Sequence, residues 1–215
     1  MTKKISPGLP QWNLKDLLKN PEKDLGTISK ALNTKISSLE KLRPSLTEKT
    51  SPKIFSTVLR LIEDIAVFSN RLGAYSHLWF AEDTTNQRSR AFETKVRDRL
   101  ANVLNRILFF DLWWQQLSHH SAQRLLTTTG SNRYYLTSLR RMKPHTLTEP
   151  EERIINIKNT TGRSALDSLY EVLTNSLTFT SPERGAHSSL SREQLSVFFR
   201  HPSANIRKRA YQEFF

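Results

Sequence analysis

The side chains that could hold a metal ion do not occur at the spacings such sites need. A hydrolytic zinc site on a helix uses two histidines four residues apart, with a glutamate between them as base. No two histidines of this sequence are four residues apart, and His119 and His120 are adjacent, so on a helix they point about 100° apart. The histidines are His77, His119, His120, His145, His187 and His201. We therefore expect no metal-binding residue in the chain.

Other catalytic arrangements are missing from the sequence as well. There is no cysteine, which excludes disulfides, a cysteine nucleophile and a cysteine-ligated metal. No G-x-S-x-G turn is present to expose a nucleophilic serine. The paired acids Glu63-Asp64, Glu82-Asp83 and Glu151-Glu152 are adjacent, so their carboxylates lie on different helix faces. We expect no catalytic and no cofactor-binding residue here.

An aromatic run, Phe109-Phe110-Asp111-Leu112-Trp113-Trp114, is dense enough to suggest stacking on bases or a ligand cage. At helical spacing, aromatic residues this dense are typical of a core or of an interface between domains. We expect a core.

The net charge of +13 suggests an anionic partner such as nucleic acid. The excess is spread along the chain, and the densest clusters, Arg140-Arg141-x-Lys143 and Arg207-Lys208-Arg209, are short enough to be helix ends or solvated faces. The most apolar stretch, residues 107–114, is far shorter than the ~20 residues that span a bilayer. Lys3-Lys4 has no apolar segment behind it, which argues against a signal peptide. We expect a cytoplasmic protein that uses neither membrane nor nucleic acid.

The elements that would position these residues are almost all helical. Apolar residues recur every three to four positions over residues 26–42, 52–80, 85–117, 134–142 and 164–177, and Ser51, Thr148 and Ser191 begin helices as N-caps. Residues 177–180 could form one edge of a hairpin with Leu190. The fold class that we predict is all-α, an elongated multi-helix bundle with a small β-hairpin near residues 177–190.

We expect two parts, an N-terminal helical bundle over residues 1–130 and a second helical segment over residues 131–215. A final helix carries Ile206, Ala210 and Phe214 on one face and has no closing glycine, asparagine or proline after it. We therefore expect a truncated sequence whose terminal phenylalanines need a partner.

Several motifs follow one another in an order known from one peptidase family. They are Trp12-Asn13-Leu14-x-Asp16-Leu17, Leu72–Leu78 followed by Glu82–Asn86, Phe109–Leu112, Tyr135-Leu136-x-x-Leu139-Arg140-x-x-Lys143-Pro144-His145-x-Leu147-x-x-x-Glu151-Glu152-x-Ile154, and Arg207-x-x-Ala210-Tyr211. This pattern resembles the N-terminal region of the oligoendopeptidase F family, which is similar to thimet oligopeptidase and its zinc metallopeptidase relatives. The resemblance covers almost the whole chain.

The resemblance implies a zinc endopeptidase that cleaves short peptides in an enclosed, mostly helical cavity. In that family a separate C-terminal domain holds zinc on an H-E-x-x-H helix, a motif that this sequence lacks. No catalytic or metal residue is therefore carried over, and we expect the chain to be inactive alone. Its expected partners are a catalytic half, in cis or in trans, and the oligopeptide substrate of the full-length parent. The alternative is a stand-alone basic helical module that binds nucleic acid or an acidic protein.

Overall fold

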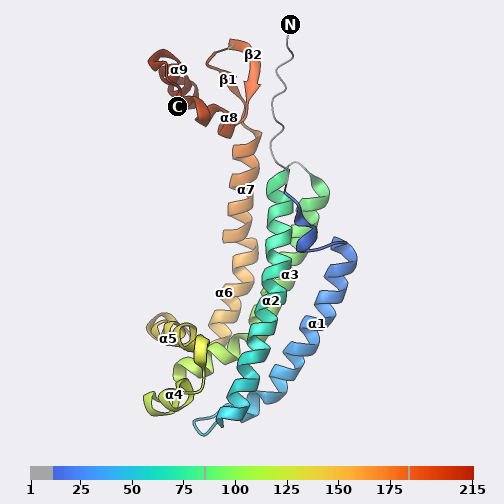
Figure 1. The fold of residues 1–215 in the computed structure, drawn as a ribbon, viewed down its shortest axis with the longest axis vertical. Helices are drawn as coiled ribbons and strands as arrows, with labels where there is room; N and C mark the ends of the chain where they lie inside the picture. The colour runs from blue at the N-terminus through green and yellow to red at the C-terminus, as the bar shows by residue number, and fades with distance from the viewer. Residues whose placement is uncertain (1–11, 85, 184) are drawn as a thin grey trace. The chain divides into compact units, whose positions relative to one another are not determined.

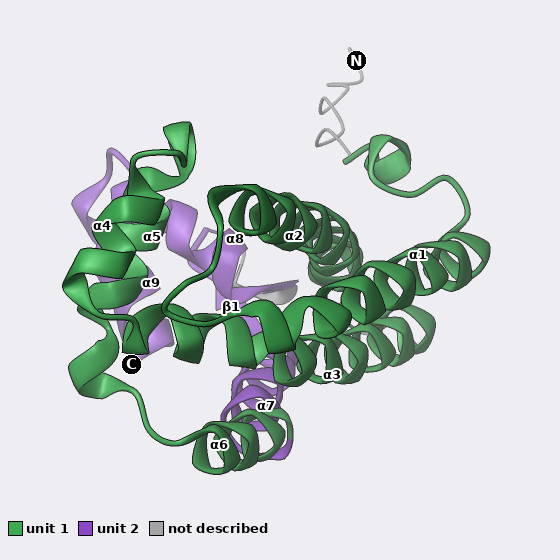
Figure 2. Ribbon diagram, turned by 90° about the horizontal axis from the view of Figure 1, so that it is seen from below, with its two compact units in different colours: residues 1–160 green, residues 161–215 purple. Residues whose placement is uncertain are grey.

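The computed structural model describes residues 12–84, 86–183 and 185–215. The chain divides into two compact units, residues 1–160 and 161–215 (Figure 2). Strands occur only in unit 2 among these residues. The prediction about a signal peptide concerns Lys3-Lys4, which lie outside the described residues.

Unit 1 is built on the long helices α1 (Pro21–Leu42), α2 (Pro52–Glu82) and α3 (Gln87–Gln116), which run side by side (Figure 1). Helix α2 begins as predicted, because Ser51 Oγ accepts a hydrogen bond from the Ile54 N–H at 3.3 Å and proline follows the cap.

Helix α1 begins earlier than the predicted residue 26. The side chain of Asn20 accepts a hydrogen bond from the Lys23 N–H at 3.3 Å, and Pro21 occupies the first helical position. This cap and proline start the helix one turn before its regular apolar spacing becomes visible.

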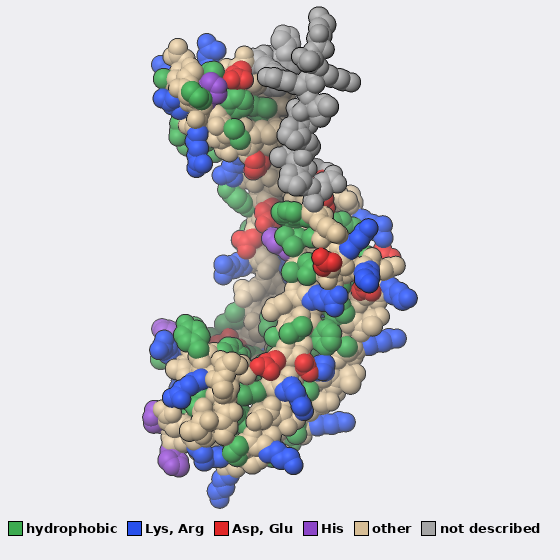
Figure 3. All heavy atoms as spheres, viewed as in Figure 1, with side chains coloured by type: hydrophobic (Ala, Val, Ile, Leu, Met, Phe, Trp, Pro, Cys, Tyr) green, Lys and Arg blue, Asp and Glu red, His purple; other side chains and the backbone are tan. Residues whose placement is uncertain are grey.

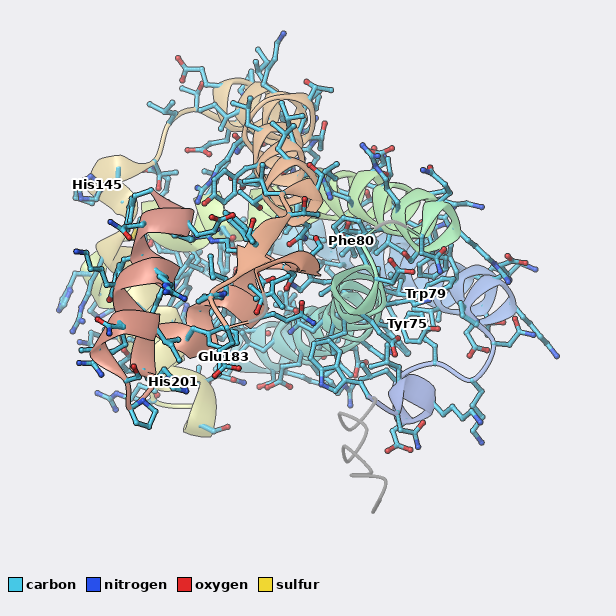
Figure 4. All side chains as sticks on the ribbon, turned by 90° about the horizontal axis from the view of Figure 1, so that it is seen from above. Tyr75, Trp79, Phe80, His145, Glu183 and His201 are labelled. Carbon is cyan, nitrogen blue, oxygen red and sulfur yellow. The ribbon has the colours of Figure 1, made fainter. Side chains whose placement is uncertain are left out.

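The core of unit 1 follows the apolar spacing of these helices. At Gly73 the backbone of α2 lies beside α3, because a Cβ atom at this position would be in van der Waals contact with Leu100 Cδ1, at 3.4 Å. Towards the α2–α3 connection, Tyr75, Trp79 and Phe92 form an aromatic cluster with ring centroids 5.5–5.9 Å apart. Figure 4 labels Tyr75 and Trp79 of this cluster. The fully buried side chains include Leu32, Ile36, Leu39, Phe55, Val58, Leu72 and Phe110.

The predicted aromatic core around Trp114 is confirmed. Trp114 is fully buried and stacks on Phe55, with ring centroids 5.1 Å apart. Its indole Nε1 donates a hydrogen bond of 2.8 Å to the carbonyl of Leu136. A ring with both its face and its polar edge satisfied inside the protein is a packing residue rather than a base-stacking platform.

The short helices α4 (His119–Leu126) and α5 (Arg133–Arg141) complete this end of unit 1. Gly130 links them with φ of +53°, a backbone conformation that glycine adopts at little cost. The guanidinium of Arg140 donates hydrogen bonds to the carbonyls of Trp114 at 2.7 Å and Leu117 at 2.9 Å. Arg140 thereby satisfies carbonyls at the C-terminal end of α3.

Helix α6 (Glu149–Thr161) follows and contains no buried residue. The N–H of Thr148, just before the helix, donates a hydrogen bond of 2.9 Å to the Glu151 carboxylate, which is half of the predicted capping box. Glu149 also pairs with Arg43 at the end of α1, with a shortest distance of 2.8 Å. These polar contacts hold the start of α6 on unit 1.

Unit 2 contains α7 (Arg163–Ser176), strands β1 (Phe179–Ser181) and β2 (Gly185–Leu190), and helices α8 (Arg192–Val197) and α9 (Ala204–Phe214). The strands pair antiparallel.

The predicted hairpin is confirmed, since Phe179 lies opposite Leu190 in the register of the strands. Ser191 and Gln194 form the predicted capping box at the start of α8.

The expectation about the terminal phenylalanines is only half right. Phe214 packs on Phe179 and Phe199, with ring centroids 5.9 and 5.5 Å apart, so its ring finds partners within unit 2. Phe215 is 94% exposed. The error arose because β1 lies far from α9 in the sequence, and spacing alone does not reveal that contact.

The predicted fold class, mostly helical with one small antiparallel hairpin, is confirmed for the described residues. The boundary between the two compact units lies between residues 160 and 161 of the chain, whereas we expected the second segment to begin at residue 131. Helix α5 falls within unit 1 because its Arg140 and the carbonyl of its Leu136 bond to the end of α3. Among the described helices, none is long and apolar enough to cross a membrane.

Candidate functional site

A groove of about 670 Å³ lies on unit 1 between α2 and α3, with α5 at one end. This volume falls within the range of about 300–1,000 Å³ that small-ligand sites occupy. We call it the α2–α3 groove. It is lined by Ile62, Ile65, Ala66, Ser69, Asn70, Gly73 and Ala74 of α2, Leu100, Val103, Leu104, Ile107 and Asp111 of α3, and Tyr135 of α5.

The groove follows from the spacing of residues on both helices. The lining positions recur every three to four residues on α2 and on α3, so each helix contributes one continuous stripe. Along α2 the stripe includes Ala66, Gly73 and Ala74, whose small side chains leave a hollow beside the leucines and isoleucines of α3. The result is an apolar channel that is open to solvent on one side.

Asp111 is the single charged side chain in the lining of this groove. Among the described residues its carboxyl group has no hydrogen bond and no ion pair. Burial raises the pKa of Asp111 from 3.8 to about 6, because removing a carboxylate from water disfavours its charged form. The carboxylate is therefore charged at neutral pH, at a cost, and has no cation beside it.

Two hydroxyl groups lie along the same groove. Tyr135 lines its end, and burial together with the nearby Asp111 raises the pKa of Tyr135 to about 12, so the phenol keeps its proton. Ser69 Oγ is buried and bonds to no group among the described residues. A helical serine commonly bonds to the carbonyl four residues before it, as Ser38 does to Thr34 at 3.0 Å. Ser69 does not, so its buried hydroxyl has no hydrogen-bond partner among the described residues.

This arrangement can bind but is poorly equipped for catalysis. The lining offers one carboxylate, neutral hydroxyl and amide groups, and a long apolar wall, with no histidine, lysine or arginine among its residues. Such a set favours an apolar molecule that carries one positive charge.

The structure does not bring the histidines together into a metal site. His77 Nδ1 lies 3.6 Å from Glu93 Oε1 in unit 1. His201 Nε2 lies 3.2 Å from Glu183 Oε1 in unit 2, and Figure 4 labels both residues of this pair. His119 and His120 are exposed at the start of α4, and the side chain of His187 lies outside what is described. Within the described ranges, no group of three or more potential ligands converges. These residues do not fit a zinc site.

The His201–Glu183 pair is a local structural feature of unit 2. His201 Nδ1 accepts a hydrogen bond from the Ser203 N–H at 3.1 Å, which leaves Nε2 to face the carboxylate. The ring of Phe198 lies against His201 with centroids 6.4 Å apart. The serine contacts His201 through its backbone, so the arrangement is not that of a nucleophile and its base.

The paired acids have structural contacts. Asp64 pairs with Lys35 of α1, and Glu63 accepts a hydrogen bond from the Asn132 side chain at 2.7 Å. Glu152 accepts the Leu147 N–H at 2.9 Å at the start of α6. Each of these acids bonds to a neighbouring element or to the backbone at the start of a helix.

One arginine of each basic cluster is held by local hydrogen bonds. Arg140 bonds to the end of α3, and Arg207 donates to the carbonyls of His201 at 2.7 Å and Pro202 at 2.9 Å. Figure 3 shows the Lys and Arg side chains of unit 1 spread over the visible face, with Asp and Glu among them. A spread of this kind gives this face a weak general positive field.

Sequence reasoning did not select Asp111, Ser69 or Tyr135. Asp111 did carry a signal, because it interrupts an apolar run in the middle of a helix. Ser69 and Tyr135 carried none, since their place in the groove depends on how α2, α3 and α5 pack together.

Comparison with known proteins gives two findings. Residues 114–179 match the family model described as Oligopeptidase F. The fold is similar to the crystal structure of oligoendopeptidase-F from Enterococcus faecium, with a TM-score of 0.73 and 16% sequence identity over 91% of this chain. The match covers 38% of that enzyme, so the chain spans well under half of its length.

A further match is the crystal structure of a proposed peptidase from Chlamydophila abortus, with 21% identity over 94% of this chain and 35% of that one. Its TM-score is 0.46. No curated protein sequence matches the chain. The resemblance drawn from the sequence motifs is thus confirmed over residues 114–179, which match the oligopeptidase F N-terminal domain and include the Tyr135–Ile154 motif.

Proposed function

We propose that this chain, which carries the oligopeptidase F domain over residues 114–179, is the non-catalytic N-terminal part of an oligoendopeptidase F-like zinc peptidase. Its role is to provide scaffold and to enclose the peptide substrate, while a catalytic half, in cis or in trans, supplies zinc and the reacting groups. The chain is not expected to hydrolyse peptides alone.

The observation that carries this proposal is the extent of the fold match. Nearly the whole chain, 91%, follows one part of an oligoendopeptidase-F that amounts to 38% of that enzyme. A likeness of this kind fits one region of a larger enzyme better than a stand-alone binding module.

The exposed apolar side chains of α6 and of α7 are evidence that a partner covers these helices. Neither helix has a buried residue, although both carry several large apolar side chains. Helices that expose so much apolar surface are typical of interaction sites. The exposed side chains are Ile154, Ile155 and Ile157 on α6, and Leu166, Leu169, Tyr170 and Leu173 on α7. We propose that the catalytic half covers these helices.

The test is a peptidase assay with and without the catalytic half. The H-E-x-x-H-bearing half encoded in the same genome is expressed together with this chain, or fused to it where the reading frame continues. Hydrolysis of an internally quenched peptide of about ten residues is then measured. We expect no hydrolysis by the chain alone, and hydrolysis by the pair that a zinc chelator abolishes.

Two results would overturn the proposal. Chelator-sensitive hydrolysis by the purified chain alone would contradict a non-catalytic role. A zinc-loaded catalytic half whose activity does not change when the chain is added, and that does not bind it, would contradict the partnership. Replacing Ile154 and Ile157 by Ser on the exposed face of α6 is a useful variant, because these side chains are 59% and 58% exposed and contribute little to folding.

A further inference from the structure

We propose that the α2–α3 groove binds the N-terminal segment of a short apolar peptide, with the free ammonium group paired with Asp111. The choice of a peptide rests on the proposed function, whereas the choice of an apolar cation rests on the groove itself.

The charge of the ligand follows from Asp111. Among the described residues this carboxyl group has no cation within ion-pairing distance, and the side chains around it are mainly aliphatic. An unpaired carboxylate in apolar surroundings is unfavourable, and a cation that enters beside it relieves the cost. Pairing of an ammonium group with Asp111 at this end of the groove is therefore more favourable in free energy than the same pairing on an exposed surface.

The length of the ligand follows from the lining of α2. The stripe from Ile62 to Ala74 covers twelve helical steps, which is about 18 Å at 1.5 Å per residue. An extended chain rises about 3.3 Å per residue, so the groove accommodates roughly five residues. Its lining beyond Asp111 is mostly aliphatic, which favours apolar side chains.

The hydrogen-bonding groups favour a peptide over a hydrocarbon chain. Ser69 Oγ is buried without a partner, and the Asn70 side chain lines the same wall. A buried hydroxyl without a partner costs free energy, which an extended peptide backbone can recover by offering N–H and C=O groups. A helical ligand bonds its own backbone internally and would leave Ser69 unpaired.

The test compares free and blocked amino termini. Binding of a five-residue apolar peptide, amidated and fluorescently labelled at its C-terminus, is measured by fluorescence anisotropy on the full chain at pH 7.5. We expect N-acetylation to weaken binding at least about tenfold, the loss typical of one hydrogen bond to a charged group. This comparison needs no variant, so it does not depend on how a mutant folds.

Matched variants then assign the effect to the groove. The Asp111→Asn variant keeps the shape of the side chain and removes its charge. Acetylation of the peptide should therefore change its affinity for this variant by less than about twofold, and a double-mutant cycle measures this loss of coupling. Asp98→Asn alters an exposed acid on the same helix and should behave as wild type. Ser69→Ala should weaken both peptides by a similar factor.

Three results would overturn the inference: no effect of acetylation on the wild-type chain, an acetylation effect that disappears in Asp98→Asn as fully as in Asp111→Asn, or displacement by an alkylamine of matched length as strong as that by the peptide itself. These outcomes are separate from those of the peptidase assay. If the catalytic half restores hydrolysis while acetylation has no effect, only the groove assignment fails. If the groove binds ammonium peptides while no partnership is found, only the proposed function fails.

Discussion

Replacing Asp111 by Asn should stabilise unit 1 at neutral pH and have a much smaller effect in acid. Asn has nearly the shape of Asp but cannot be charged, so the variant removes the cost of holding a carboxylate in the apolar groove. The pKa of Asp111 is raised to about 6 in the fold, compared with 3.8 as its ordinary value. The folded state therefore binds the proton more tightly than the unfolded chain, and wild-type stability falls as the pH rises between these values.

The size of the effect follows from linkage between protonation and folding. With these pKa values, the charged form costs about 1 kcal/mol at pH 4.5 and about 3 kcal/mol at pH 7.5. The gain in stability of the variant over wild type should therefore grow by about 2 kcal/mol between the two pH values. For a protein of this size that corresponds to a rise in Tm on the order of 4 to 8 °C.

Urea unfolding monitored by tryptophan fluorescence is the assay. All four tryptophans, Trp12, Trp79, Trp113 and Trp114, belong to unit 1, so the signal reports this unit alone. Asp98→Asn is the control, and as an exposed acid it should change stability by less than about 0.5 kcal/mol at either pH. A variant that is less stable than wild type at pH 7.5, or a gain that does not depend on pH, would refute the account of Asp111 as a costly buried charge.

Further predictions concern contacts between the helices of unit 1 and the charge of the chain. Trp114→Phe should destabilise unit 1 by about 1–3 kcal/mol in the same urea assay, because it leaves a buried carbonyl of α5 without its donor. Gly130→Ala should cost about 1 kcal/mol, since an alanine at φ of +53° is strained, and an unchanged midpoint would contradict this. Hydrogen bonds from the hydroxyl of Ser121 and from the backbone and hydroxyl of Ser118 lower the pKa of Glu48 to about 2, so its stabilising effect is present above its ordinary value of 4.5 and is lost towards pH 2; carboxyl NMR titration measures this value, and one near 4.5 would be inconsistent. Binding to duplex DNA, measured at several salt concentrations, should be weak and should not depend on the DNA sequence. Tight binding with a strong preference for one sequence would favour the alternative of a basic binding module.

Local signals were enough to predict most helices, and their success has a physical basis. Ser51-Pro52 and Ser191-x-x-Gln194 satisfy orphan N–H groups within a few residues, so their effect does not depend on distant packing. The hairpin that pairs Phe179 with Leu190 was predictable for the same reason, because its strands are close in sequence.

Features that depend on contacts between distant segments could not be predicted in this way. The partners of Phe214 come from β1 and from the turn after α8, and sequence spacing contains no information about them. The groove is a similar case, because Ser69 and Tyr135 join Asp111 only once α2, α3 and α5 have packed. The interrupted apolar run at Asp111 was the one signal in the sequence that a buried charge was present.

The central claim, that this chain is the enclosing and non-catalytic part of a peptidase, is tested most directly by titration. A fixed amount of the zinc-loaded catalytic half is mixed with increasing amounts of this chain, and hydrolysis of the quenched peptide is recorded. The account predicts activity that rises to a plateau at one chain per catalytic half, and a weaker rise with the Ile154→Ser, Ile157→Ser variant. Activity that is independent of the chain, or that appears with the chain alone, would contradict it.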